Sequence, residues 1–431
     1  MTVLTSWGRT LRAECDAKSP LFMAQAQTGF TGACIYGNGR SYGDCALNPG
    51  GRALVTQALN RVLNFDAATG ILQVEPGVTF HQIVTQWLPS GWMVPVSPGT
   101  GFATLGGALA NDVHGKNHEH AGTLAQHVTE LDLLLPNGSQ HTITPADEAL
   151  FRATAGGLGL TGLITRLAIK MEKLPGGRVR VRRKRVNNLD DFLAAMAESA
   201  GATHSVGWID ALAQGANLGR GIWETGESIP GNTNPLGPRL MVPFDFPGWA
   251  LNSLSVKAFN ALYWRRVPPG GAEFSTDLVR LLYPLDALLH WNRIYGSRGF
   301  YQFQCVVPFA GGDRVLRDML TVIAKSGQAS FLAVLKRLGG GRGGYLSFPM
   351  PGYTLALDFP NKPGIAELYG RLCAMTRDAG GRVYLAKDGL LTADMFQSMY
   401  PELNKFRVVL REIDPERRME SAMARRLKIY G

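Results

Sequence analysis

The sequence predicts an α+β protein with two domains. The chain has 431 residues, which is more than one hydrophobic core usually organises. Its first part consists of short apolar runs separated by glycines, a pattern typical of strands joined by tight turns. From about residue 179, helical and strand-like stretches alternate, which indicates a mainly antiparallel sheet covered by helices. We therefore place a first domain at 1–178 and a second at 179–381.

Local signals position elements in the first domain. One strand ends at Pro76-Gly77, and an amphipathic helix follows with Thr79 as its N-cap. The pair Asn137-Gly138 predicts a hairpin turn between two strands.

A basic strand is expected at 178–186, across the start of the second domain, and in it Arg and Lys partly alternate with Val. Helices are expected at 187–200 and 313–327, and strands at 300–309, 330–338 and 353–360. Residues 227–250 are rich in Pro and Gly yet carry large apolar side chains, which is typical of a lid or a binding loop.

Composition narrows the function classes. The net charge of +10 attracts polyanions, but no nucleic-acid-binding motif accompanies the basic strand, whose simplest interpretation is a solvated face. The five cysteines form no CxxC pair, so we expect no metal site. Without a signal peptide or an apolar span, we expect a cytoplasmic protein and leave open peripheral contact with the inner membrane face.

Four segments carry the signals for a cofactor. Residues 36–51, 98–122 and 153–165 contain more glycines than a packed core needs, and VYLAKD follows at 383–388. Glycines let backbone N–H groups converge on an anion, because no Cβ blocks the approach. The spacing does not match the GxGxxG motif of a Rossmann site.

In order and spacing, these segments resemble the PCMH-type FAD-binding superfamily of vanillyl-alcohol oxidase. Within it the chain resembles the decaprenylphosphoryl-ribose 2-oxidases nearly from end to end, through GRSYGD, HGKNH, YQFQCVVP and MYPELNKF. The resemblance implies FAD and a C-terminal segment, 382–431, that completes the FAD domain. The implied cofactor-binding residues are Tyr36, Gly37, Asn38, Gly39, Arg40, Ser41, Tyr42, Pro98, Gly99, Thr100, Gly106, Gly107, Asn111, His114, Gly115, Asn117, Gly157, Gly159, Gly162 and Tyr384.

The same resemblance assigns catalytic roles to His114 and Lys387. A lone histidine or lysine is more often structural, so these roles depend on the family match. Oxidation of a secondary alcohol needs a base near the reacting carbon, and the sequence does not rank the two residues. The implied substrate-binding residues are Lys116, Trp208, Gln302, Gln304, Lys336, Thr354 and Lys387.

The resemblance implies hydride transfer from C2 of a polyprenylphosphoryl ribose to the flavin, with a short-chain NAD(P)-dependent reductase as partner. Two departures bear on this expectation. Arg40 stands where many relatives carry a flavin-linking histidine, so we expect non-covalent FAD, and Thr354 and Ala356 replace an Asn and a Cys of the family. Two alternatives stay open: an aldonolactone or alditol oxidase, and a flavin-binding protein without turnover.

Overall fold

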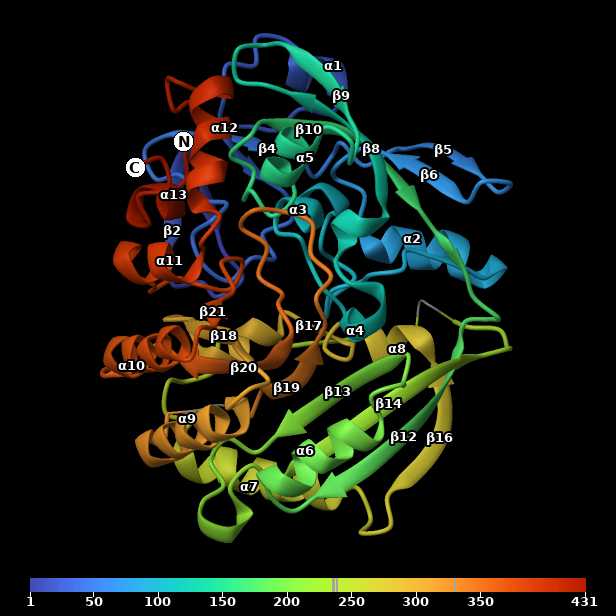
Figure 1. Ribbon diagram of the computed structural model, residues 1–431, viewed down its shortest axis with the longest axis vertical. Coiled ribbons are helices and arrows are strands. Elements are labelled where there is room, and N and C mark those ends of the chain that lie inside the picture. Colours follow the sequence, from blue (N-terminus) through green and yellow to red (C-terminus); the bar gives the residue numbers. More distant parts are fainter. Residues whose placement is uncertain (235–236, 238, 329–330) are drawn as a thin grey trace.

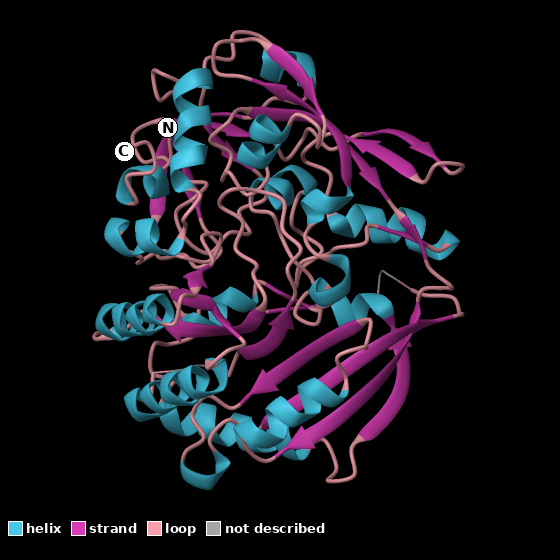
Figure 2. Cartoon of the chain, in the orientation of Figure 1, coloured by secondary structure: helices cyan, strands magenta, loops and turns pink. Residues whose placement is uncertain are grey.

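The structure is a computed structural model that describes residues 1–234, 237, 239–328 and 331–431. Two lobes are stacked along its long axis (Figure 1). The upper lobe combines several small sheets and helices, whereas the lower lobe is built on one large sheet (Figure 2). The predicted α+β class is confirmed.

Two sheets form the framework of the upper lobe. The first has the order β1-β2-β4-β3 and contains β1 (Thr2–Thr5), β2 (Arg12–Lys18), β3 (Cys34–Tyr36) and β4 (Arg52–Val55). The second has the order β5-β6-β10-β8-β9 and contains β5 (Val62–Asp66), β6 (Ile71–Val74), β8 (Val128–Leu134), β9 (Gln140–Ile143) and β10 (Leu163–Lys170). A short pair joins β7 (Trp92–Met93) to β11 (Glu172–Lys173).

The helices that residues 1–178 contribute to the upper lobe are short, and the local signals predicted there are confirmed. They are α1 (Met23–Gln27), α2 (Phe80–Trp87), η1 (Leu88–Ser90), α3 (Leu105–Ala110), α4 (His118–Ala121), η2 (Leu124–His127) and α5 (Glu148–Thr154). Thr79 caps α2, because its side chain accepts from the backbone N–H of Gln82 in a capping box. Asn137-Gly138 turns β8 into β9, and Gly138 has a φ of +87°.

The lower lobe contains an eight-stranded sheet, in the order β16-β12-β14-β13-β19-β20-β18-β21, whose paired neighbours are antiparallel. Its strands are β12 (Arg178–Val186), β13 (His204–Ile209), β14 (Gly221–Ile229), β16 (Ala272–Asp277), β18 (Phe300–Pro308), β19 (Ala333–Leu338), β20 (Gly352–Pro360) and β21 (Arg382–Val383). Helices α6 (Leu189–Glu198), α9 (Gly312–Ser326) and α10 (Ile365–Asp378) share its main hydrophobic core. These helices cover one face of the sheet. The other face lines the cavity that is described below.

The segment between β14 and β16 is more regular than the loop predicted for 227–250. β14 continues to Ile229, and β15 (Leu240–Met241) pairs in parallel with β17 (Leu288–Leu289). Residues 235, 236 and 238 of the predicted loop lie outside the described residues. The chain also contains α7 (Ser253–Arg265) between β14 and β16, η3 (Gly215–Asn217) before β14, and α8 (Leu278–Leu282) and η4 (Trp291–Tyr295) after β16.

The basic strand β12 is largely neutralised by its neighbours. Arg182 pairs with Glu273 of β16 at 2.8 Å, and Arg183 pairs with Glu224 of β14. Lys184 pairs with Glu198 of α6. These ion pairs support the interpretation of β12 as a structural strand with a solvated face.

The C-terminal segment returns to the upper lobe. It contains α11 (Ala393–Met399), α12 (Leu403–Ile413) and α13 (Ala422–Arg426), and both chain ends lie on the same side of that lobe (Figure 1). The backbone N–H of Ala422 donates to the carbonyl of Leu47 at 2.7 Å. These contacts support our proposed assignment of 382–431 to the FAD domain, and the boundaries near 178 and 382 stay predictions.

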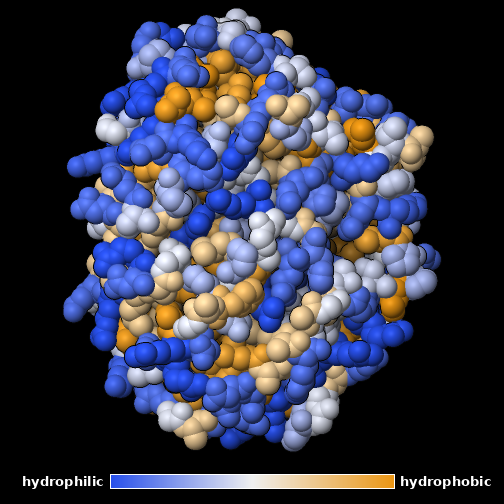
Figure 3. Space-filling view, in the orientation of Figure 1, coloured by the Kyte–Doolittle hydropathy of each residue, from blue (hydrophilic) through white to orange (hydrophobic). Residues whose placement is uncertain are grey.

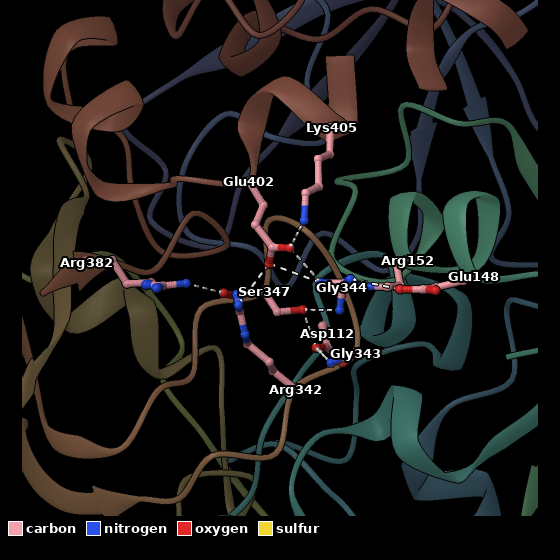
Figure 4. Close-up of polar contacts among 10 residues, drawn as sticks. All are labelled: Asp112, Glu148, Arg152, Arg342, Gly343, Gly344, Ser347, Arg382, Glu402 and Lys405. Carbon is pink, nitrogen blue, oxygen red and sulfur yellow. Dashed lines mark hydrogen bonds and ion pairs between the residues drawn. The ribbon is translucent and has the colours of Figure 1, made fainter. Parts of the chain in front are cut away.

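A polar cluster holds residues 339–347, which connect β19 to β20, against the upper lobe (Figure 4). Glu402, the residue that precedes α12, accepts from Arg152 and Arg342. Buried Asp112 accepts from the backbone N–H of Gly343 and from the hydroxyl of Ser347. Asp112 is fully enclosed and has a φ of +39°. Because it lies two residues before a predicted catalytic histidine, the cluster fixes the backbone of the site.

Within the described ranges, we find no helix that combines the length and the apolar character needed to cross a bilayer.

Candidate active site

One cavity of about 770 Å³ lies between the glycine-rich loops of the upper lobe and the open face of the large sheet. Its size falls within the range of pockets that hold cofactors and their substrates. Most of the predicted residues line it. On the cofactor side these are Tyr36, Gly37, Asn38, Gly39, Arg40, Ser41, Tyr42, Pro98, Gly99, Thr100, Gly106, Gly107, Asn111, His114, Gly115, Gly159, Gly162 and Tyr384. On the substrate side these are Lys116, Trp208, Gln302, Gln304, Lys336 and Lys387.

Three predicted residues are absent from the described wall of this cavity. Asn117 is buried and donates through its side-chain amide to the carbonyl of Pro95. Gly157 lies against the backbone of Ala153, where a Cβ would collide with the carbonyl. Thr354 is buried behind Gln304, whose amide contacts the Thr354 hydroxyl at 3.3 Å. In this structure Asn117, Gly157 and Thr354 can act on a ligand only through the residues that line the cavity. Their assignment as binding residues stays a prediction.

The glycine-rich loops form the cofactor side of the cavity. Gly39 has a φ of +60°, and a Cβ there would collide with the Tyr36 hydroxyl, so only glycine fits this turn. Gly99 faces open space, because a Cβ added there would meet no atom of the described residues within 4 Å outside its immediate neighbours. Thr104 caps α3, which fixes the second loop. These loops leave backbone groups accessible to a dinucleotide.

Arg40 lies in this part of the cavity. Its guanidinium stacks between Trp7 and Phe102, at 4.3 Å and 4.9 Å from the ring centroids. Its Nε atom is buried without a hydrogen-bond partner among the described residues, and burial lowers its pKa. An arginine has no nucleophilic nitrogen at neutral pH that could attach to a flavin.

We therefore expect FAD to be held without a covalent bond. Acid precipitation of the purified protein should release the yellow colour into the supernatant. A coloured pellet after washing would contradict this expectation.

His114 is buried between aromatic rings, with Phe348 at 5.4 Å and Tyr384 at 5.3 Å between centroids. The amide nitrogen of Gln304 lies 3.1 Å from Nε2, whereas the buried Nδ1 has no partner among the residues described. Burial, followed by the nearby charge of Lys336, holds the pKa of His114 well below its usual value. The imidazole is therefore neutral and leaves one ring nitrogen for a cofactor atom.

Lys387 lies on a turn that starts at Tyr384, where its backbone N–H donates to the Tyr384 carbonyl. Its ammonium lies 3.7 Å from the centroid of the Tyr42 ring. Burial lowers the pKa of Lys387 to about 7, and the opposite charge of Asp358 limits the fall. A lysine with this pKa can exchange a proton at neutral pH.

The substrate side is a row of side chains on one face of the sheet. Gln304 pairs with Ala356, Ala356 with Val334, and Val334 with Trp208 across neighbouring strands. Strands are spaced by about 4.8 Å, so this row spans roughly 14 Å. Lys336 lies on the same face of β19, and burial lowers its pKa to about 8. The site is therefore longer than a single furanose ring needs.

Asp358 is a site residue that the sequence analysis did not single out. It is fully buried on β20 and accepts from the Gln302 amide at 2.5 Å and from the Tyr295 hydroxyl at 3.0 Å. Because the amide nitrogen of Gln302 donates to Asp358, the Gln302 carbonyl points away from this contact. Burial raises the pKa of Asp358 to about 7. The sequence did offer a signal for this residue, because Asp358 is a charged residue within the otherwise apolar strand LALDFP.

A second group of missed residues lines the part of the cavity beyond strand β13 and Trp208. Arg183 and Glu224 come from β12 and β14, and Tyr263 and Arg266 come from the end of α7 and the residue after it. Lys116 faces them, and burial lowers its pKa to about 8. Sequence reasoning missed these residues because only the folded sheet brings β12, β14 and α7 to one cavity.

The loops, the cavity and the unpartnered polar atoms of Arg40, Asn111 and His114 fit FAD. The FAD binding domain family matches residues 29–144, and the D-arabinono-1,4-lactone oxidase family matches residues 341–427.

Among curated proteins, the chain is 36% identical to decaprenylphosphoryl-β-D-ribose oxidase of Mycolicibacterium smegmatis over 99% of this chain and 97% of that protein. It is 28% identical to the alditol oxidase of a Streptomyces species over 33% of this chain and 34% of that enzyme. It is also 30% identical to a putative D-arabinono-1,4-lactone oxidase of Neurospora crassa over 26% of this chain and 20% of that protein. The chain therefore belongs to the decaprenylphosphoryl-β-D-ribose oxidase family of FAD-dependent oxidoreductases.

Proposed function

We propose that the protein oxidises the C2 hydroxyl of a polyprenylphosphoryl ribose to a ketone, as the first half of a 2-epimerisation. The similarity to decaprenylphosphoryl-β-D-ribose oxidase over 99% of the chain carries this proposal. The roughly 14 Å row from Gln304 to Trp208 supports it, because a small free sugar would fill only part of that length. FAD supplies the hydride acceptor when it is bound.

In this proposal Lys387 takes the hydroxyl proton as the C–H bond breaks. The pKa of about 7 leaves a substantial fraction of neutral amine at physiological pH. His114 is less suited, because Gln304 already contacts its Nε2 atom. The ammonium formed on Lys387 is stabilised by the Tyr42 ring and by the Asp358 carboxylate. Gln302, held by Asp358, offers its carbonyl oxygen to a sugar hydroxyl.

The role of Lys387 predicts a pH dependence. The rate of anaerobic flavin reduction should rise with pH through about 7 and level off above it, because only the neutral amine accepts a proton. The rate at saturating substrate is measured by stopped flow between pH 6 and pH 9. A rate that falls over this range would contradict the assignment.

Substrate specificity tests the function itself. The purified protein is mixed anaerobically with a polyprenylphosphoryl ribose, with free alditols and with aldonolactones, and flavin bleaching is recorded. We expect bleaching by the lipid-linked ribose. Bleaching by small sugars alone would favour the second candidate, an aldonolactone or alditol oxidase, which the lactone oxidase match at residues 341–427 supports. A protein that binds FAD but is reduced by none of them would fit the non-catalytic alternative.

Completion of the epimerisation requires reduction of the keto group from the opposite face. The resemblance implies a short-chain reductase that uses a nicotinamide cofactor as the partner for this step. We propose that the two enzymes act in sequence on one lipid-linked sugar.

We further propose that the protein touches the membrane surface peripherally. The face in Figure 3 is mostly hydrophilic, with smaller hydrophobic areas among the charged residues. Four large apolar side chains of the segment 240–249 are more than half exposed: Leu240, Met241, Phe244 and Trp249. An apolar group with cations nearby suits the interface of an anionic membrane.

Replacing Met241, Phe244 and Trp249 by serine should weaken co-sedimentation with anionic vesicles. Leu63→Ser is the control, because Leu63 is an exposed apolar residue of β5 outside this segment. Equal vesicle binding by the triple variant and the wild type would contradict the contact.

A further inference from the structure

We infer that helix α7 and Arg266 form the recognition site for the phosphodiester and the isoprenoid chain of the substrate. This inference rests on the function proposed above. It assigns the sugar to the part of the cavity near His114 and Lys387, and the lipid to the part beyond Trp208, at Tyr263 and Arg266. The resulting specificity residues are Phe259, Leu262, Tyr263 and Arg266.

The helix is firmly anchored on its inner side. Asn260 is buried and donates to Asp210 at 2.7 Å, and the indole N–H of Trp264 donates to the carbonyl of Val186 at 2.9 Å. Asn252 caps its N-terminus in a capping box. These contacts hold the helix in place, while Leu262 and Arg266 on its opposite side are exposed.

A continuous set of aromatic rings runs from the cavity to this surface. Trp208, in the cavity wall, lies 4.7 Å from the ring of Tyr263 between centroids. Tyr263 stacks on Phe259 at 5.6 Å, and Phe259 contacts Phe331 at 5.3 Å. Phe259 is 44% exposed, so the set reaches solvent. An unsaturated hydrocarbon chain would bury apolar area along these rings.

Helical spacing adds a leucine to this track. Residues 259, 262, 263 and 266 are three or four positions apart and therefore share one side of the helix. Leu262 is 70% exposed and directly precedes Tyr263, which lines the cavity. An apolar ligand on this side of the helix would cover both Leu262 and Phe259.

Arg266 supplies the charge at the junction between cavity and track. Its guanidinium lies 3.6 Å from the Tyr263 ring centroid and donates to the Tyr263 hydroxyl at 2.6 Å. Arg183 is paired with Glu224, whereas Arg266 has no ion pair among the described residues. With Lys116, the cations at this end outnumber the one carboxylate, which suits an anionic phosphodiester.

Chain-length discrimination tests the lipid track. Wild type is compared with the Phe259→Ser/Leu262→Ser variant on a long-chain polyprenylphosphoryl ribose and on ribosyl phosphate esterified with a single short isoprene unit. Both are assayed in the same detergent, so that membrane contact does not contribute. We expect the long-to-short ratio of kcat/KM to fall about tenfold in the variant, because apolar contacts to the chain are lost. Leu254→Ser is the control, because Leu254 is an exposed leucine of α7 on a different side of the helix.

The charge is tested separately with Arg266→Gln and Arg266→Lys. The glutamine variant should raise KM for both lipids about tenfold and leave kcat nearly unchanged, and lysine should recover part of the loss. An unchanged chain-length ratio and an unchanged KM would overturn the inference while leaving the proposed function intact. Wild type that reacts with neither lipid would instead remove the proposed function. FAD content and thermal unfolding of each variant confirm that the fold is retained.

Discussion

Lys387→Ala lowers the rate of flavin reduction by substrate about 10² to 10⁴-fold, which is the usual contribution of a general base. The variant retains bound FAD, because most of the cofactor side of the cavity is built from other segments. Rapid mixing without oxygen measures the rate, and the flavin absorbance measures the content. Both are read from the same sample, so a loss of cofactor is separated from a loss of chemistry.

Small primary amines provide the sharper form of this test. If Lys387 acts through its amine, methylamine added to the alanine variant should restore part of the rate, and more of it at high pH. Lys405→Ala serves as the control, because Lys405 is a mostly exposed lysine of α12. Reduction of Lys387→Ala at the wild-type rate would remove the lysine from the mechanism.

Arg426→Ala lowers the free energy of unfolding by about 3–5 kcal/mol, because it leaves buried carboxylates without their partner. The guanidinium bridges Asp44 at 2.7 Å and Asp388 at 2.9 Å, and Asp388 is fully buried. Denaturant titration measures the loss. The variant should also bind FAD more weakly, since Asp388 directly follows Lys387 and fixes its turn.

The matched control is Arg411→Ala, which removes an exposed arginine from the same C-terminal segment. Its stability should stay within about 0.5 kcal/mol of wild type. If Arg426→Ala unfolded with the wild-type midpoint, the C-terminal segment would not be held to the upper lobe in the way we describe.

Elements defined by local chemistry were predictable from the sequence. Thr79 is the predicted N-cap of α2, and Asn137-Gly138 forms the predicted turn. The alternation in the basic strand gave its bounds, because period-two patterning depends only on neighbours in the chain. The glycine loops and His114 were predictable through the family resemblance, and they line one cavity.

Features that depend on distant segments were not predictable. The contact between Asp358 and Gln302 depends on the register of β20 against β18. Arg266 reaches the cavity only because α7 is anchored over β13, and nothing in its local sequence marks it. A residue whose role depends on strand register or helix docking carries no signal in its own neighbourhood.

Substrate deuterated at C2 of the ribose tests the central claim most directly. The protein is mixed anaerobically with a polyprenylphosphoryl ribose that carries hydrogen or deuterium at C2, and flavin bleaching is followed. We predict that deuterium slows bleaching severalfold and that the product is a 2-keto sugar. Equal rates with both substrates, together with a product oxidised at another carbon, would contradict the account.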